Sequence, residues 1–393
     1  MAVVAGAFAF LLGAGFLAAL FSIGDLSPRR RLFEINVYLG SAAVYLALGG
    51  FLVVQAASAL GGAASSPFRM RWPWLLLPLF PLAVVAGQLQ ADHPERLPWL
   101  FPFINLAVVA IPSLSVAAIC ATRYARANPL AWPVSWREWT SGFVYGAIGA
   151  TTIAGIINTL ALFLFAVILT NANGVGTFAV ERLPHPWGVV FDLGVLSGIA
   201  PIDEEFWKGM LVALFFFRRG GVARCFLWGV LAGAGFNLLE TFQNSLGAAS
   251  PSNLADQRLG GSWWLFACAR AGTGSMHALA AGFSALGFYG LLRRQPRFAW
   301  GYPAGVLLHG TWNFLVYVVY GDALFSGAWP DRTALDVAGV TGLILVLAGT
   351  LVVLWTVSGS LKDGGPAPIY RLLGMRPAAS EAVRDGMLVE PGG

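Results

Sequence analysis

The residues best suited to chemistry in this sequence lie in "PIDEEFWKGM", residues 201–210, which has apolar sequence on both sides. The stretch contains Glu204, Glu205 and Lys208. A buried carboxylate can act as a general base or bind a metal ion. On a helix, Lys208 lies on the same face as Glu204, one turn further along, whereas Glu205 points about 100° away. The lysine can therefore hold one carboxylate charged and leave the other free for proton transfer or a metal.

Polar groups of the same kind recur in the apolar segments that follow. Glu240 lies in "GFNLLETF", and His277 follows Arg270 by seven residues, which is two turns on one helix face. His309 and Asn313 in "HGTWN" are four residues apart, so the amide can orient the ring or donate to an oxyanion. Arg270 can bind a substrate or extend its charged end toward the membrane surface.

These groups lie at a similar height above basic loops, if each segment is a helix that rises 1.5 Å per residue. The heights are about 20 Å for Glu205 above Arg218, about 24 Å for Glu240 above Arg224 and for His277 above Arg293, and about 18 Å for His309 above Arg297. One polar site between four consecutive helices explains this agreement better than independent placement does.

Each group also has a structural alternative. Residues 201–210 can form an external or re-entrant loop, because Pro201 can end a helix. Glu240 can pair with Lys208 or Arg270 and merely lock helices together, and His277 can bind a backbone carbonyl. A charged side chain costs about 2.5–3.5 kcal/mol at the centre of a membrane helix, so unpaired charges are excluded.

The elements that position these residues follow from the composition. The 393-residue chain is 57% hydrophobic and 11% charged, with a mean hydropathy of +0.71. Soluble domains carry about 25% charged residues, so the chain is not a soluble globular protein. Apolar runs of about 20 residues predict an all-α polytopic integral membrane protein with 8–10 transmembrane helices and a four-helix catalytic core. The expected segments are 2–22, 36–60, 73–90, 100–121, 139–170, 187–217, 223–246, 262–292, 301–320 and 335–357.

The net charge of +5 indicates topology rather than nucleic-acid binding, because it comes mostly from short arginine-rich loops. Loops 123–126, 218–224 and 293–297 are expected in the cytoplasm, which also places the C-terminus there. We expect three regions: N-terminal membrane segments of unknown role (1–138), a membrane core that carries the polar residues described above (139–357) and a flexible cytoplasmic tail (358–393).

Four motifs in residues 190–320 resemble those of the PrsW-type intramembrane protease family, within the CAAX-protease/PrsW superfamily. "EEFWK" resembles its EExxK motif and "FNLLE" its FxxxE motif. "RAGTGSMHALAAG" is similar to its Arg-then-His-Ala helix, and "LHGTWNF" to its final His-x-x-x-Asn helix. The family often has Asn where Thr241 follows Glu240. The related CAAX-processing group has histidine at the position of Glu240, so that histidine's role does not transfer.

The resemblance implies an intramembrane endopeptidase that uses activated water, without a covalent intermediate, on a membrane-anchored protein substrate. The partners are then that substrate and the lipid bilayer, with no nucleic acid, and the location is a bacterial plasma membrane. The base is Glu204 or Glu205, a zinc ion can be bound, and Lys208 and Arg270 are supporting residues. The expected site is Glu204, Glu205, Glu240, His277, His309 and Asn313, with Glu205, Glu240, His277 and His309 as metal ligands.

Two other functions use the same buried polar cluster. A proton-coupled transporter needs a polar track across the membrane. Below the shared height, however, the helices are apolar ("LVALFFF", "CFLWGVLAG"), which favours a cavity open to the outer half of the bilayer. The other is a non-catalytic membrane scaffold, like the anterior-pharynx-defective subunit of γ-secretase.

Overall fold

A computed structural model describes residues 2–24, 26–129, 134–216, 221–248, 263–320, 332–361 and 363. Within these ranges every regular element is a helix, and the single β-contact is an isolated bridge between Pro67 and Ser135. The all-α prediction is confirmed.

In the part of the chain that the structure describes, ten helical segments correspond to the ten predicted ones, and several contain short π-helical turns. Their bounds are α1 Ala2–Leu20; α2 Pro28–Ile35, η1 Asn36–Gly40 and α3 Ser41–Leu60; η2 Pro73–Leu76 and α4 Leu79–Asp92; α5 Phe101–Ala127; α6 Trp136–Val144, η3 Tyr145–Ala150 and α7 Thr151–Ala172; α8 Trp187–Leu193, η5 Gly194–Ile199, α9 Ala200–Leu211 and η6 Val212–Phe216; α10 Val222–Ala248; α12 Trp263–Leu292; α14 Gly301–Tyr320; and α16 Arg332–Ser360. Short helices η4 Val180–Arg182 and α13 Pro296–Ala299 lie in connections.

In the described ranges, seven of these segments are long and apolar enough to cross a membrane. They are Pro28–Leu60, Pro73–Asp92, Phe101–Ala127, Trp136–Ala172, Val222–Gly247, Phe266–Leu292 and Val337–Ser360. The α1, α8–α9 and α14 segments are not among the seven. The chain is thus a polytopic membrane protein.

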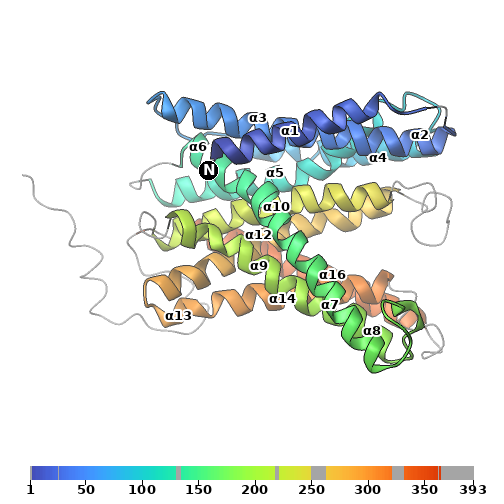
Figure 1. Cartoon of the computed structure of the whole chain (residues 1–393). Helices are drawn as coiled ribbons and strands as arrows, with labels where there is room; N and C mark the ends of the chain where they lie inside the picture. Colours follow the sequence, from blue (N-terminus) through green and yellow to red (C-terminus); the bar gives the residue numbers. More distant parts are fainter. Residues whose placement is uncertain are drawn as a thin grey trace, which may run out of the picture.

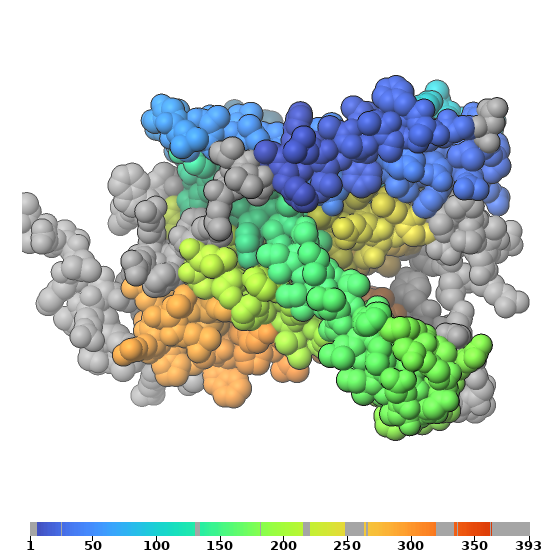
Figure 2. Space-filling model, viewed as in Figure 1, coloured from blue at the N-terminus to red at the C-terminus, as the bar shows by residue number. Residues whose placement is uncertain are grey.

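Helices α10 and α12 form the centre of the bundle. Their apolar windows are 89% and 78% buried, against 17–50% for the other five candidate spans. Helices α1–α4 lie on one side of this pair and α9 and α14 on the other, while α7 crosses the bundle obliquely (Figure 1). In the space-filling view, α7 and α8 form a diagonal band across this face (Figure 2).

Close packing of α10 on α12 depends on glycine. A Cβ on Gly233 would collide with the carbonyl oxygen of His277, and a Cβ on Gly229 with that of Ala281. Small residues let the backbones of membrane helices approach closely, where dispersion contacts hold them together. The position of His277 is therefore coupled directly to α10.

The charged stretch 201–210 is helical, so its interpretation as a loop is wrong. Pro201 lies in the first turn of α9, where a missing N–H is tolerated. The helix continues through it from the π-helical turn η5, and such turns accommodate disrupted α-helical hydrogen bonding. Glu204, Glu205 and Lys208 consequently project from a continuous helix.

The predicted start of the flexible tail at residue 358 needs correction, because α16 continues through Ser360. Asp363 is also tightly held: its carboxylate accepts hydrogen bonds from the Tyr124 hydroxyl (2.5 Å) and the Ala223 backbone N–H (3.1 Å). Its own N–H donates to Asn128 Oδ1 at 2.8 Å. Residues 364–393 of the predicted tail, and 218–220 of the predicted loop 218–224, lie outside the described residues.

Candidate active site

The four helices that carry the predicted motifs pack around one buried polar cluster. Helix α9 contacts α10, α12 and α14, and α12 also packs on α10 and α14. The rings of His277 on α12 and His309 on α14 lie 4.6 Å apart, centroid to centroid, and nearly perpendicular. The shared height inferred from the sequence thus corresponds to spatial proximity.

Lys208 lies at the centre of this cluster and is completely buried. Its ammonium nitrogen is 2.8 Å from Glu205 Oε1, 3.3 Å from Glu204 Oε2 and 2.9 Å from His277 Nδ1. It also lies 3.8 Å from the centroid of the Phe236 ring, a cation–π distance. Because an ammonium group can only donate, His277 Nδ1 must accept this hydrogen bond.

The two adjacent glutamates have different surroundings. Glu205 is fully buried: Oε1 lies 3.0 Å from His309 Nδ1, and Oε2 accepts a hydrogen bond from Ser284 at 3.2 Å. Glu204 is 8% exposed, and its Oε2 lies 3.7 Å from His309 Nε2. Glu205 therefore holds the His309 ring by one nitrogen, while the other nitrogen faces Glu204.

Glu240 positions the second histidine. Its Oε2 lies 2.8 Å from His277 Nε2 and 2.8 Å from Arg270 Nη2. Arg270 also donates to the Thr241 hydroxyl at 3.0 and 3.1 Å. Arg270 therefore pairs with Glu240, which is the structural alternative that the sequence left open.

Comparison with known proteins identifies the family. A family model described as "PrsW family intramembrane metalloprotease" matches residues 134–350, more than half of the chain. This chain belongs to the PrsW family. It is an intramembrane protease, as the motifs in α9, α10, α12 and α14 predicted. No curated protein and no solved structure matches it.

The family name implies a metal ion, and three buried residues of this PrsW-family chain have suitable donors. Glu204, His277 and His309 each offer one ligand atom, and these atoms lie within 4.8 Å of one another. Two histidines and one glutamate make a frequent set at catalytic zinc sites, where a fourth position stays open. The Lys208 ammonium contacts two of these donors, Glu204 Oε2 and His277 Nδ1, so a metal ion at His277 Nδ1 would replace that hydrogen bond.

This trio differs from the ligand set expected from the sequence. Glu204 replaces Glu205, whose carboxylate contacts Lys208, His309 Nδ1 and Ser284. Glu240 is not in the trio, because its carboxylate faces Arg270 and His277 Nε2. Glu205 contacts His309 Nδ1 and Glu240 contacts His277 Nε2, the kind of contact that outer carboxylates often make at metal sites.

Asn313 does not orient the His309 ring. Its amide donates to the carbonyl oxygen of Leu196, in the π-helical turn η5, at 2.8 Å. The ring is instead held by Glu205 through Nδ1. Asn313 thus joins α14 to the segment that leads into α9, and one helical turn further along α14 Tyr317 donates to Asp192 of α8 at 2.6 Å.

One further residue of the PrsW-family site is not part of any of the four sequence motifs. Asn158 of α7 donates from its amide nitrogen to Glu204 Oε1 at 3.3 Å. Its amide oxygen is buried and has no hydrogen-bond partner among the described residues. A single amide in the apolar run "TTIAGIINTLALFLF" was the available signal, because polar residues inside membrane helices usually have a function.

Proposed function

We propose that this protease cleaves membrane-anchored proteins with a water molecule activated at Glu204, His277 and His309. The observation that carries the proposal is the meeting of these three side chains, from three helices, within 4.8 Å. Glu204 is the base in this proposal, because it is 8% exposed and its hydrogen bonds from Asn158 and Lys208 are both 3.3 Å long, whereas Glu205 is fully buried and held by Lys208 at 2.8 Å.

Each residue has a defined part in the reaction. Glu204 accepts a proton from the attacking water, the water oxygen bonds to the scissile carbonyl carbon, and Glu204 returns the proton to the amine as the C–N bond breaks. Glu205 keeps the proton of His309 on Nδ1, which leaves the Nε2 lone pair directed toward Glu204. Glu240 acts in the same way on His277 through Nε2.

Zinc is the metal that we propose, because two imidazoles and one carboxylate suit it. Bound there, it would supply Lewis-acid polarisation of the carbonyl and a more acidic attacking water. Its ligands would be Glu204, His277 and His309. His277 Nδ1 would then exchange its hydrogen bond from Lys208 for the metal, and the second carboxylate oxygen of Glu204 would act as the base. Asn313 remains a candidate oxyanion donor only if its bond to Leu196 opens when substrate binds.

The wider expectations stay part of this proposal. The family match over 134–350 supports a protease core at 139–357, with 1–138 as an additional membrane region and the residues that follow α16, which ends at Ser360, as the tail. The substrate is a protein held in or at the bilayer. We also keep a bacterial plasma membrane, a cytoplasmic C-terminus and a site open to the outer half of the bilayer.

The test is cleavage of membrane-anchored substrates by the purified chain in proteoliposomes. Glu204→Gln, His277→Ala and His309→Ala should each abolish cleavage, and metal analysis should find about one zinc per wild-type chain and less in these variants. Asp203→Asn is the matched control, because Asp203 is adjacent on α9 but bonds Trp207 at 3.0 Å. Wild-type rates in the three site variants would refute the assignment, and active protein without metal would refute the zinc proposal alone.

A further inference from the structure

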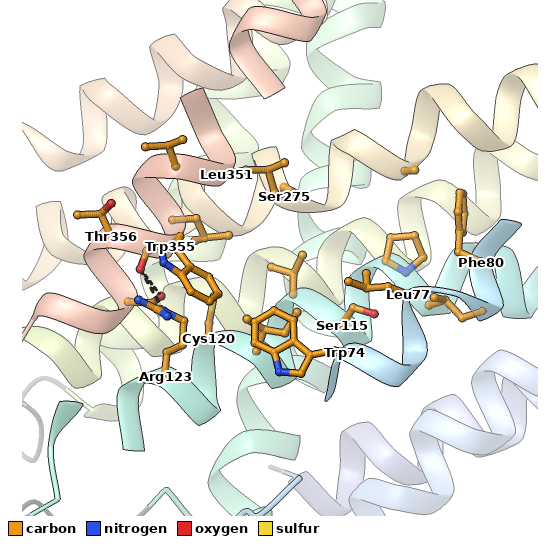
Figure 3. Close-up of a pocket in the computed structure, with 18 residues that line it drawn as sticks. Trp74, Leu77, Phe80, Ser115, Cys120, Arg123, Ser275, Leu351, Trp355 and Thr356 are labelled. Atoms are coloured by element: carbon orange, nitrogen blue, oxygen red, sulfur yellow. Dashed lines mark hydrogen bonds between the residues drawn. The ribbon is translucent and has the colours of Figure 1, made fainter. Parts of the chain in front are cut away.

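A cavity lies on the other side of α12 from the catalytic cluster. Its volume is about 540 Å³, within the usual range for small-molecule sites, and its walls come from η2–α4, α5, α12 and α16. Figure 3 shows the side chains around it, from Arg123 and Trp355 at one end to Phe80 at the other. Most of the lining is apolar, with a few hydroxyls and one charged residue, Arg123.

The end with Arg123 has the composition of a membrane interface. The rings of Trp74 and Trp355 lie 5.5 Å apart, and the Arg123 guanidinium carbon is 3.4 Å from the centroid of the Trp355 ring. Arg123 Nε also donates to the Trp355 carbonyl oxygen at 3.1 Å. Tryptophan and arginine gather where hydrocarbon meets the polar headgroups.

The other end reaches toward the middle of the bilayer. Pro112 lines the cavity eleven residues before Arg123 on α5, a distance of about 16 Å along the helix. That is about half the thickness of the hydrocarbon core. Leu77, Leu351 and Val352, which also line the cavity, are exposed at 47%, 48% and 64%, so it opens sideways on the surface that α4 and α16 present to lipid.

The positive charge of Arg123 at the interfacial end of the cavity favours an anionic ligand. No acidic residue lines the cavity, and in the described ranges no carboxylate lies within ion-pair distance of Arg123. Arg126 is exposed, one helical turn further toward the end of α5. An arginine guanidinium binds phosphate oxygens well because it presents several N–H donors in a plane.

We propose that this cavity binds one anionic phospholipid, with an acyl chain between α4, α5, α12 and α16 and its phosphate at Arg123. The lipid would also contact α12 on the face opposite the catalytic cluster. Ala271 and Ser275 of α12 line the cavity, and His277 lies two residues further on, on the opposite face of the helix. Binding at this cavity is separate from proteolysis and is measured without a substrate.

The test is native mass spectrometry of the purified full chain in detergent, with phosphatidylglycerol and phosphatidylcholine of identical acyl chains added in equal amounts. One phosphatidylglycerol should be retained in preference to phosphatidylcholine. Arg123→Gln should weaken that retention about fivefold, the effect of one cation near an anionic lipid. Arg294→Gln is the control, since Arg294 is exposed in a loop expected on the same side of the membrane and does not line the cavity.

A second variant tests the acyl-chain part of the proposal. Ser115 is 1% exposed, lines the cavity, and its hydroxyl has no hydrogen-bond partner among the described residues. Ser115→Leu should therefore fold normally, as size-exclusion chromatography would show, but should fill the cavity and retain neither lipid. Equal retention of both lipids by the wild type, no retained lipid, equal effects of Arg123→Gln and Arg294→Gln, or unchanged retention by Ser115→Leu would each overturn the proposal.

Discussion

Lys208→Met should destabilise the protein strongly, because it removes the cation that two carboxylates share. Among the described residues, Lys208 is the one cation within 4 Å of either Glu204 or Glu205, and its side chain is fully buried. Removing one partner of a buried ion pair costs about 3–5 kcal/mol, since the remaining charge has no compensation. Methionine nearly preserves the volume, so this figure reports mostly on charge.

A second substitution separates charge from packing. Glu205→Gln combined with Lys208→Met removes one charge of each sign and leaves a neutral pair in the same space. The double variant should recover about 1–3 kcal/mol relative to Lys208→Met alone, as expected for residues in direct contact. It should stay inactive, because Glu205→Gln also removes the carboxylate that holds the His309 ring through Nδ1.

Unfolding by sodium dodecyl sulfate in mixed micelles, followed by far-UV circular dichroism, measures these free energies, and cleavage in proteoliposomes measures activity. An unfolding midpoint for Lys208→Met equal to the wild-type value would show that the lysine is not the countercharge of the cluster. A double variant less stable than Lys208→Met would show that the two residues are not coupled as the distances suggest.

Three further substitutions test how the cluster is held. Glu240→Gln should weaken metal affinity about 10- to 100-fold without abolishing binding, as loss of an outer carboxylate does. Competition with a zinc chelator measures this affinity. An unchanged affinity would show that Glu240 does not orient His277 as a metal ligand. Gly233→Ala should lower the free energy of unfolding by about 1–3 kcal/mol, because the added methyl group pushes α10 away from α12. Gly349→Ala, which has open space around it, should leave the free energy of unfolding unchanged. Equal unfolding midpoints of the two variants in sodium dodecyl sulfate would refute this prediction. Asn158→Leu should lower kcat at least about tenfold, the effect of losing a hydrogen bond to a charged group. The control is Thr159→Val, which loses only a hydrogen bond within α7 and should keep the wild-type kcat. Equal kcat values in the two variants would show that Asn158 is not part of the site.

Sequence reasoning found the residues of the cluster because depth can be calculated along a chain. Helix rise from the basic loops places Glu205, Glu240, His277 and His309 at one height, and the structure brings them together. Rotation of each helix about its own axis cannot be calculated in this way. The sequence could therefore not tell Glu204 from Glu205 as the carboxylate facing both histidines.

The same limit explains the other differences. Arg270 faces Glu240 because of how α12 is rotated against α10, which depends on glycine contacts such as that of Gly233. Asn313 faces Leu196 because η5 shifts the helix by part of a turn just before α9. Asn158 lies on α7, whose long apolar run carried no motif that would link it to a glutamate 46 residues later.

The contacts of Asp363 decide where the chain can be shortened. Its carboxylate accepts hydrogen bonds from the backbone N–H groups of Ala223 and Arg224, the first turn of α10, and from Tyr124 near the end of α5. A negative charge at a helix N-terminus is stabilising, and α10 is the helix that carries Glu240. A truncation after residue 357, at the apparent end of the apolar sequence, would thus remove this carboxylate from the first turn of α10, whereas one that retains Asp363 would keep its contacts with α5 and α10.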